Sequence, residues 1–291
     1  MQYTPILHKI NYTTYELSVL RLDLIHPEIS GNKWFKLKYN LQQAKAEGKN
    51  TIITFGGAFS NHIAATAYAC KEARVNSIGI IRGEESSQNN PTLLTAKKNG
   101  MNLRFVSREE YKLKNNKEYI RNLQIEYQNS YIIPEGGDNE YGQKGCEEIL
   151  SSETNNFDLI FCAYGTGTTF KGLAHALQAH QQLIGVNVLK YEAETHLSNT
   201  TILNTYHFGG YAKHTKELLD FKIWFEEKFT ITLDYVYTAK LFYAVFDMIK
   251  QNKIDKSKKI LIIHSGGLQG NTGYENRYNL NPNRQVNDAH G

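Results

Sequence analysis

Short apolar runs alternate with longer segments of mixed polarity along most of the chain. Runs rich in Ile, Val, Leu and Phe with turn residues around them are typical of strands buried in a sheet, whereas apolar residues three and four positions apart are typical of helices. The pattern predicts strands at 51–55, 77–81, 102–106, 131–133, 157–162, 183–188 and 259–263.

Helices are predicted between these strands. Ser60 is a suitable N-cap for a helix over 61–73, and Pro91 starts another helix at a position that proline favours. Further helices are predicted at 168–180, 213–228 and 239–250. Strands and helices in this alternation are the pattern of βαβ units, so the sequence predicts an α/β fold with parallel sheets.

The composition narrows the class of protein. Of the 291 residues, 41% are hydrophobic, and the net charge of +4 is spread along the chain. We therefore expect no nucleic-acid partner. No apolar run reaches the roughly 18 residues of a membrane span, and no signal-peptide pattern stands at the N-terminus, so we expect no membrane association and a cytoplasmic protein. Cys70, Cys146 and Cys162 lack metal-site spacing, and no metal is predicted.

Two segments have the residue types of a pyridoxal-phosphate (PLP) site. Lys33 follows Gly31 and Asn32, and Lys36 returns to the same helical face one turn later. The Gly/Thr-rich stretch 165–169 lies between a predicted strand and a predicted helix, where backbone N–H groups hold phosphates. Each feature alone has a simpler interpretation, because a single lysine is usually a solvated surface residue and a Gly-Thr pair is usually a turn.

A nucleotide-binding loop is the main alternative for 165–169. Gly165, Gly167 and Gly172 have the spacing G-x-G-x-x-x-x-G, which differs from the dinucleotide fingerprint, and no Walker lysine follows. The predicted roles in PLP binding are an amine for the aldehyde, a phosphate cradle and polar partners for the ring. The residues predicted for these roles are Lys33, Lys36, Asn61, Gly165, Thr166, Gly167, Thr168 and Thr169.

Ordered motifs over residues 4–270 resemble the 1-aminocyclopropane-1-carboxylate deaminase/D-cysteine desulfhydrase family of fold-type II PLP enzymes. The matching segments are 30–33 with Lys36, Ser60-Asn61-His62, 133–137, 165–169, Gly210-Tyr211, 235–240 and 264–267. The resemblance implies two interleaved three-layer α/β domains with parallel-type sheets, and a homodimer. It places 1–36 and 143–291 in a large PLP-binding domain and 37–142 in a small α/β domain.

The same resemblance implies roles for individual residues. Lys33 is the Schiff-base lysine and Asn61 lies at the ring oxygen, while the substrate-binding residues are Ser60, Asn61, His62, Tyr211 and Tyr237. Lys33, Ser60 and Tyr237 are the predicted catalytic residues. Simpler interpretations exist for three of them, because Ser60 can serve as a helix cap alone, His62 as a structural histidine, and Tyr237 as packing.

The resemblance also places Thr238 and Ser265 among the cofactor-binding residues. The reaction depends on the group that faces the pyridine nitrogen. The resemblance implies Glu and Leu at the positions of Thr238 and Ser265 in ring-opening deaminases, so the two hydroxyls favour D-cysteine desulfhydration to pyruvate, ammonia and hydrogen sulfide. Cyclopropane ring opening and a non-catalytic binding protein remain as alternatives. The chain departs from the family pattern at Phe59, at Ala64 and over 212–215, close to the expected substrate.

Overall fold

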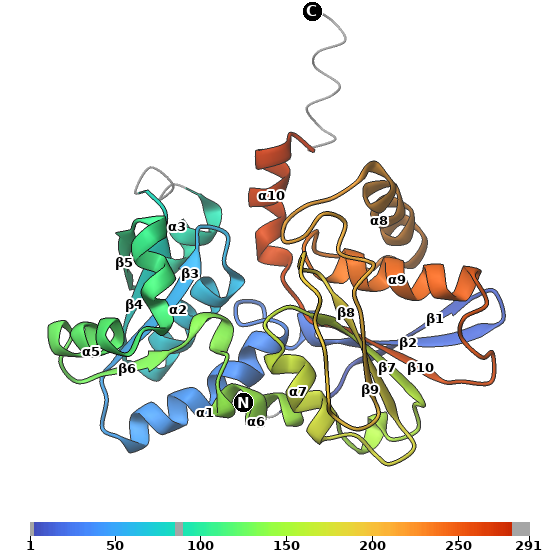
Figure 1. The fold of residues 1–291 in the computed structure, drawn as a ribbon, viewed down its shortest axis with the longest axis horizontal. Coiled ribbons are helices and arrows are strands. Elements are labelled where there is room, and N and C mark those ends of the chain that lie inside the picture. The colour runs from blue at the N-terminus through green and yellow to red at the C-terminus, as the bar shows by residue number, and fades with distance from the viewer. Residues whose placement is uncertain (1–2, 85–89, 281–291) are drawn as a thin grey trace, which may run out of the picture.

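The computed structural model describes residues 3–84 and 90–280, and its backbone forms two separate sheets (Figure 1). The larger sheet has six strands in the order β1-β2-β10-β7-β8-β9. All neighbours are parallel except β1 and β2, which form an antiparallel hairpin at one edge. Its strands are β1 Leu7–Tyr12, β2 Tyr15–Arg21, β7 Leu159–Tyr164, β8 Gln182–Asn187, β9 Thr200–Leu203 and β10 Ile260–His264.

The smaller sheet is entirely parallel and has four strands in the order β5-β4-β3-β6. These strands are β3 Thr51–Gly57, β4 Asn76–Arg82, β5 Met101–Val106 and β6 Ser130–Ile133. The α-helices of the described residues are α1 Asn32–Ala46, α2 Asn61–Ala73, α3 Pro91–Lys98, α4 Arg108–Lys112, α5 Lys117–Glu126, α6 Glu140–Glu147, α7 Thr168–His175, α8 Lys216–Phe229, α9 Thr238–Lys250 and α10 Asn271–Tyr278.

Each sheet is covered by helices on both faces. Along β10, Ile260 and Ile262 pack in a cluster with α8 and α9, whereas Leu261 and Ile263 pack in a second cluster with Phe35 of α1 and residues of α7. Alternate strand residues point to opposite faces, so both faces of this strand are buried. The predicted α/β fold with three-layer packing and parallel sheets is confirmed.

The strands expected from apolar runs all exist, with ends shifted by one or two residues. The hairpin β1–β2 and the short strand β9 were not predicted. Four of the six β1 residues are exposed, and the turn between β1 and β2 holds Thr13 at a φ of 56°, where Asn or Gly is usual. The helix predicted at 168–180 ends at His175.

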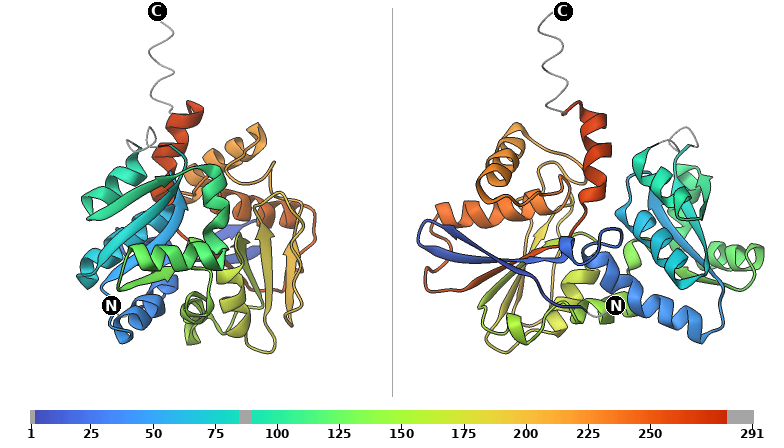
Figure 2. Two further views of the ribbon diagram at one scale, coloured as in Figure 1. Left: turned by 60° about the vertical axis from the view of Figure 1, so that its left-hand side comes forward. Right: turned by 180° about the vertical axis from the view of Figure 1, so that it is seen from behind.

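The strands of the smaller sheet all lie between residues 51 and 133, inside the predicted small domain. The predicted boundary at 36/37 falls within α1, and the division into domains stays a prediction. Helix α10 lies between the two halves of the molecule in the views of Figure 1 and Figure 2 and contacts α3 of the smaller half. In residues 3–84 and 90–280, no helix is both long and apolar enough to cross a bilayer.

Candidate active site

A cavity of about 600 Å³ lies between the two sheets, at the ends of β3, β4, β7 and β10. The carboxyl ends of parallel strands and the helices that follow them are the usual place for ligands in α/β folds. All but two of the site residues predicted from the sequence line this cavity; Thr168 and Thr238 do not.

Gly31 places Lys33 in the cavity by docking the start of α1 against the end of β10. Gly31 has a φ of +71°, and a Cβ there would lie 1.9 Å from the backbone oxygen of Ser265. The Asn32 N–H donates to that same oxygen at 3.1 Å. Only glycine allows this approach, so the helix that carries Lys33 begins in contact with Ser265.

The Lys33 amine has the electrostatics of a nucleophile. Burial and, secondly, the positive charge of Lys36 lower its pKa from 10.5 to about 7, against the opposing effects of Cys146 and the Asp234 carboxylate. Its Nζ donates to Asn32 Oδ1 at 2.6 Å. A half-buried lysine with a pKa near 7 has a large neutral fraction at physiological pH, as imine formation requires.

We expect the lowered pKa of Lys33 to show in the pH dependence of its reaction with amine-reactive reagents. In the protein without cofactor, labelling of Lys33 by an amine-reactive reagent should rise as the pH passes about 7, because the amine loses its proton there instead of near 10.5. Peptide mass spectrometry after timed labelling gives the profile. The Lys36→Met variant should titrate at higher pH, and an unshifted wild-type profile near 10.5 would contradict the assignment.

The turn before α7 has the geometry of an anion cradle. Gly167 is the N-cap of α7 at a φ of 90°, and Thr166 and Thr169 line the cavity beside it. Thr169 Oγ1 accepts a hydrogen bond from Asn32 Nδ2 at 2.9 Å, which joins the cradle to the start of α1. Thr168 points away, since its hydroxyl donates to Asp138 at 2.7 Å. A phosphate here would meet backbone N–H groups at a positive helix end.

Lys36 adds a cation to the cradle from α1. The side chain is 5% exposed and lines the cavity, and among the described residues it has no acidic partner within ion-pair distance. Burial lowers its pKa, and the charge of Asp138 opposes that shift. A buried cation without a protein partner is costly, so this position fits an anionic ligand.

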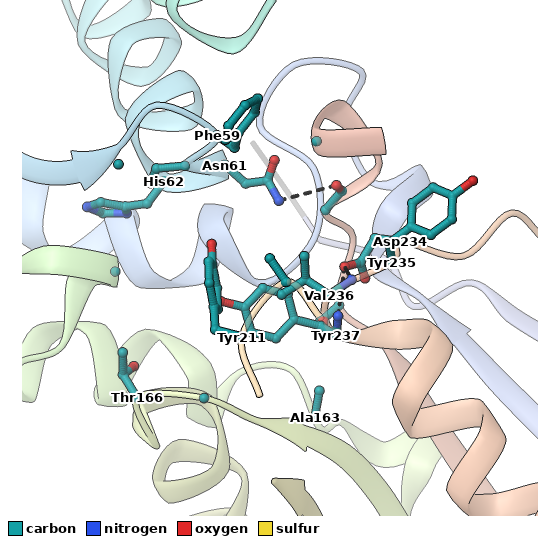
Figure 3. A pocket seen from close by; sticks show the side chains of 18 of the residues that line it. Phe59, Asn61, His62, Ala163, Thr166, Tyr211, Asp234, Tyr235, Val236 and Tyr237 are labelled. Atoms are coloured by element: carbon teal, nitrogen blue, oxygen red, sulfur yellow. Dashed lines mark hydrogen bonds between the residues drawn. The ribbon is translucent and has the colours of Figure 1, made fainter. Parts of the chain in front are cut away.

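The start of α2 contributes Ser60 and Asn61. Ser60 is the N-cap, and its Oγ accepts from Ile63 N at 3.4 Å, which confirms the predicted helix start. Asn61 Nδ2 donates to Gly267 O at 3.2 Å, and its buried Oδ1 has no partner within the described part of the chain. Figure 3 shows Asn61 facing the cavity opposite Tyr211 and Tyr237.

His62 is a neutral histidine with one free ring nitrogen. Its Nε2 lies 2.9 Å from Thr54 Oγ1, and that hydroxyl donates to Ile133 O at 2.8 Å, so Nε2 carries the proton. Burial and the charges of Lys33 and Lys36 hold its pKa well below 6.5. Nδ1 is then an acceptor, and it has no partner among the described residues.

Tyr211 and Tyr237 form the opposite wall, with ring centroids 6.2 Å apart in an edge-to-face arrangement. Burial raises the Tyr237 pKa well above 10, so its hydroxyl stays protonated and acts as a donor. Lys240, which is fully buried, holds the loop before Tyr211: its Nζ donates to the carbonyls of His207 at 2.8 Å and Gly210 at 2.7 Å. We assign Lys240 as a positioning residue, since it does not line the cavity.

A family pattern described as pyridoxal-phosphate dependent enzyme matches residues 3–266 of this chain. The chain belongs to this family. The enzyme and cofactor predictions are thereby confirmed, and PLP is the cofactor.

Relatives in the same family carry the two names expected from the motifs. A Pyrococcus horikoshii protein provisionally named 1-aminocyclopropane-1-carboxylate deaminase is 31% identical over 94% of this chain and 90% of its own length. A bifunctional D-cysteine desulfhydrase/1-aminocyclopropane-1-carboxylate deaminase of Arabidopsis thaliana is 31% identical over 88% of this chain and 73% of its own. A solved structure described as an ACC deaminase homologue aligns with a TM-score of 0.78 at 28% identity, over 90% of this chain and 88% of that one. The predicted family resemblance is confirmed.

The cavity fits PLP on its own geometry. The neutral fraction of Lys33, the unpaired cation of Lys36 and the N-terminus of α7 supply the amine and the phosphate contacts. The unpartnered Asn61 Oδ1 and His62 Nδ1 are buried polar atoms that native proteins rarely leave without a ligand or water. The individual contacts to the cofactor stay predictions.

The structure separates the two hydroxyls predicted to face the ring nitrogen. Ser265 lines the cavity at the end of β10. Thr238 is fully buried in the first turn of α9, where its hydroxyl donates to Asp234 Oδ2 at 2.7 Å. We therefore take Ser265 as the hydroxyl placed to meet a bound ring.

Sequence reasoning missed Asp234, a buried carboxylate that lines the cavity. It accepts from the backbone N–H groups of Val236, Tyr237 and Thr238 at 2.8–2.9 Å, so it caps the start of α9. Its position four residues before the helix was the available signal. Arg82, Lys213, Tyr274 and Arg277 also line the cavity, but no local pattern links these residues in the sequence.

Proposed function

We propose that this enzyme catalyses α,β-elimination on a small β-substituted amino acid, with D-cysteine as the substrate of the reaction to pyruvate, ammonia and hydrogen sulfide. The observation that carries the proposal is Ser265, a neutral hydroxyl that lines the cavity at a position where the family resemblance implies leucine in ring-opening deaminases. Bound PLP supplies an electron sink for the pair released at Cα.

The chain's own residues have definite tasks in this proposal. Lys33 holds the cofactor and, once the substrate has replaced it, takes the proton from Cα, which suits an amine with a pKa of about 7. The N–H groups at the start of α2 and the Ser60 hydroxyl bind the substrate carboxylate. Tyr237, which stays protonated, donates to the departing sulfur.

A second candidate is the ring-opening deaminase that gives 2-oxobutanoate and ammonia. The 31% identical relatives carry that name, and Asp234 places a carboxylate on the cavity wall. Both Asp234 oxygens already accept hydrogen bonds from backbone N–H groups at the start of α9. This carboxylate therefore has a structural role that does not involve the cofactor. Elimination remains the first candidate for this reason.

We expect the wild type to release pyruvate from D-cysteine and little 2-oxobutanoate from 1-aminocyclopropane-1-carboxylate. Ser265→Asp should shift the ratio of the two activities towards ring opening, since Ser265 is the hydroxyl that lines the cavity and a carboxylate at the ring nitrogen strengthens the electron sink. Both products are measured for both proteins with purified holoenzyme. A wild type that prefers the cyclopropane substrate would refute the substrate, and an unchanged ratio in the variant would refute the electronic argument.

We also propose that the enzyme acts as a cytoplasmic homodimer. The support for the dimer is the family resemblance. Light scattering on purified holoenzyme tests it, and a monomer at micromolar concentration would refute it.

A further inference from the structure

Three cations surround the opening of the cavity, and we call them the cationic rim: Arg82 at the end of β4, Lys213 in the loop after Tyr211, and Arg277 in α10. All three are exposed and line the cavity, so they stand where it meets solvent. Within the described residues, none of them makes an ion pair with a carboxylate.

Contacts between neighbouring residues place the rim cations around one opening. The Arg277 guanidinium lies 6.0 Å from the Phe59 ring and 5.5 Å from the Tyr278 ring. Tyr278 Oη donates to the carbonyl of Ala212 at 3.0 Å, next to Lys213. The chain of contacts therefore runs from Phe59 through α10 to Lys213.

Arg82 closes the ring from the smaller sheet. Its Nη2 lies 3.6 Å from the position of a Cβ on Gly57, two residues before Phe59. Burial and the Glu135 carboxylate raise the Tyr211 pKa, and the Arg82 guanidinium opposes that rise. Arg82 and Tyr211 both line the cavity.

Within the described residues, the two acidic residues of the cavity, Glu135 and Asp234, make no ion pair with the rim cations. Glu135 Oε2 lies 3.5 Å from Lys114 Nζ, and Asp234 accepts hydrogen bonds from backbone N–H groups at the start of α9. The residues expected to hold the cofactor phosphate come from α1 and the turn before α7, whereas the rim comes from β4, α10 and the loop after Tyr211. The rim is therefore a separate positive field at the substrate side.

We propose that, among β-substituted alanines, the enzyme prefers those whose β-substituent carries a negative charge, and that the cationic rim binds this charge. The proposal rests on the elimination reaction above and names its substrate class: a β-substituted alanine with an anionic leaving group. D-Cysteine, whose thiol is neutral near pH 7, is then a slower substrate. Three residues where the sequence departs from the family pattern lie at the cavity beside the rim: Phe59, Ala212 and Lys213.

The step balances with O-phosphoserine as the probe. Lys33 takes the proton from Cα, the Cβ–O bond breaks, and its electron pair leaves with inorganic phosphate. A double bond forms between Cα and Cβ, and water hydrolyses the released enamine to pyruvate and ammonium. No oxidant or reductant is needed.

The test compares turnover of O-phosphoserine with turnover of O-acetylserine, using both enantiomers of each compound. The two compounds carry a charged and a neutral group on the same β-oxygen. We expect the holoenzyme to favour phosphoserine by about tenfold or more in kcat/KM, as one charge-assisted hydrogen bond allows. The triple variant Arg82→Gln, Lys213→Gln, Arg277→Gln should remove that preference and leave acetylserine turnover within about threefold. The preference should also fall with added salt, since the rim is exposed.

Lys253→Gln is the matched control, because this exposed lysine lies outside the cavity and should leave the preference unchanged. Equal turnover of the two probes by the wild type, or a preference that survives the triple variant, would overturn the proposal. If no amino acid yields pyruvate, the elimination reaction fails separately. Calorimetry of phosphoserine binding to the wild type and the triple variant then still tests whether the cationic rim binds the anionic group. Equal affinities of the two proteins would refute this role.

Discussion

Lys33→Ala is expected to abolish the covalent link to PLP and to lower turnover at least about a thousandfold, because the variant loses both the imine and the base at Cα. Lys33 is the lysine whose amine combines a pKa of about 7 with a place on the cavity wall beside Ser265. Borohydride reduction of the holoenzyme followed by peptide mass spectrometry locates the adduct. Loss of the yellow colour in the variant gives a second measurement.

Two other lysines serve as controls for this assignment. Lys240→Met should keep the adduct on Lys33, since the Lys240 amine is enclosed by backbone carbonyls and lies off the cavity. Lys36→Met should keep the adduct but retain PLP less tightly, because it removes a cation at the phosphate. An adduct on Lys36 or Lys240 in the wild type, with Lys33 unmodified, would refute the assignment.

Gly31→Ala is expected to cost roughly 3 kcal/mol or more of folding free energy, as the sum of a left-handed backbone penalty and a backbone clash. The new Cβ would lie 1.9 Å from the backbone oxygen of Ser265, the residue that follows β10. Urea denaturation of the protein without cofactor measures the change. The start of α1 must also shift, so PLP should bind more weakly.

Gly48→Ala is the matched control at the other end of α1. Gly48 has a φ of +66°, close to the +71° of Gly31, but its Cβ would have nothing within 4 Å. Its cost should be the backbone penalty alone, about 1 kcal/mol. Equal destabilisation by the two substitutions would show that the contact with β10 is not what requires glycine at position 31.

The parts of the fold that were predictable are those with a local physical cause. The strands of the parallel sheets are apolar on both faces, so they stand out as continuous runs. The helix Asn61–Ala73 was predicted to the residue because Ser60 is a cap at one end. The edge strand β1 lacks this signal, since exposed and buried positions mix along it and it pairs on one side only.

The candidate site also has features that the local sequence predicts and features that only tertiary contacts determine. Lys33 and the turn before α7 were predictable because glycines and threonines around them are required by close backbone approach. The outward turn of Thr168 and Thr238 towards Asp138 and Asp234 was not, because these hydroxyls choose their partners through tertiary contacts. The cationic rim is a further case, since β4, α10 and the loop after Tyr211 meet only in the folded chain.

The clamp formed by Lys240 has a consequence for the width of the cavity. It ties the loop before Tyr211 to α9, so Tyr211 and Tyr237 form one block with the larger sheet. Ser60 belongs to the smaller sheet through α2. The hydrogen bond from Asn61 Nδ2 to Gly267 O joins the start of α2 to the segment after β10, so it ties Ser60 to the same half of the molecule as the tyrosine pair. The separation between Ser60 and the two tyrosines then limits the length of amino acid that the cavity can hold.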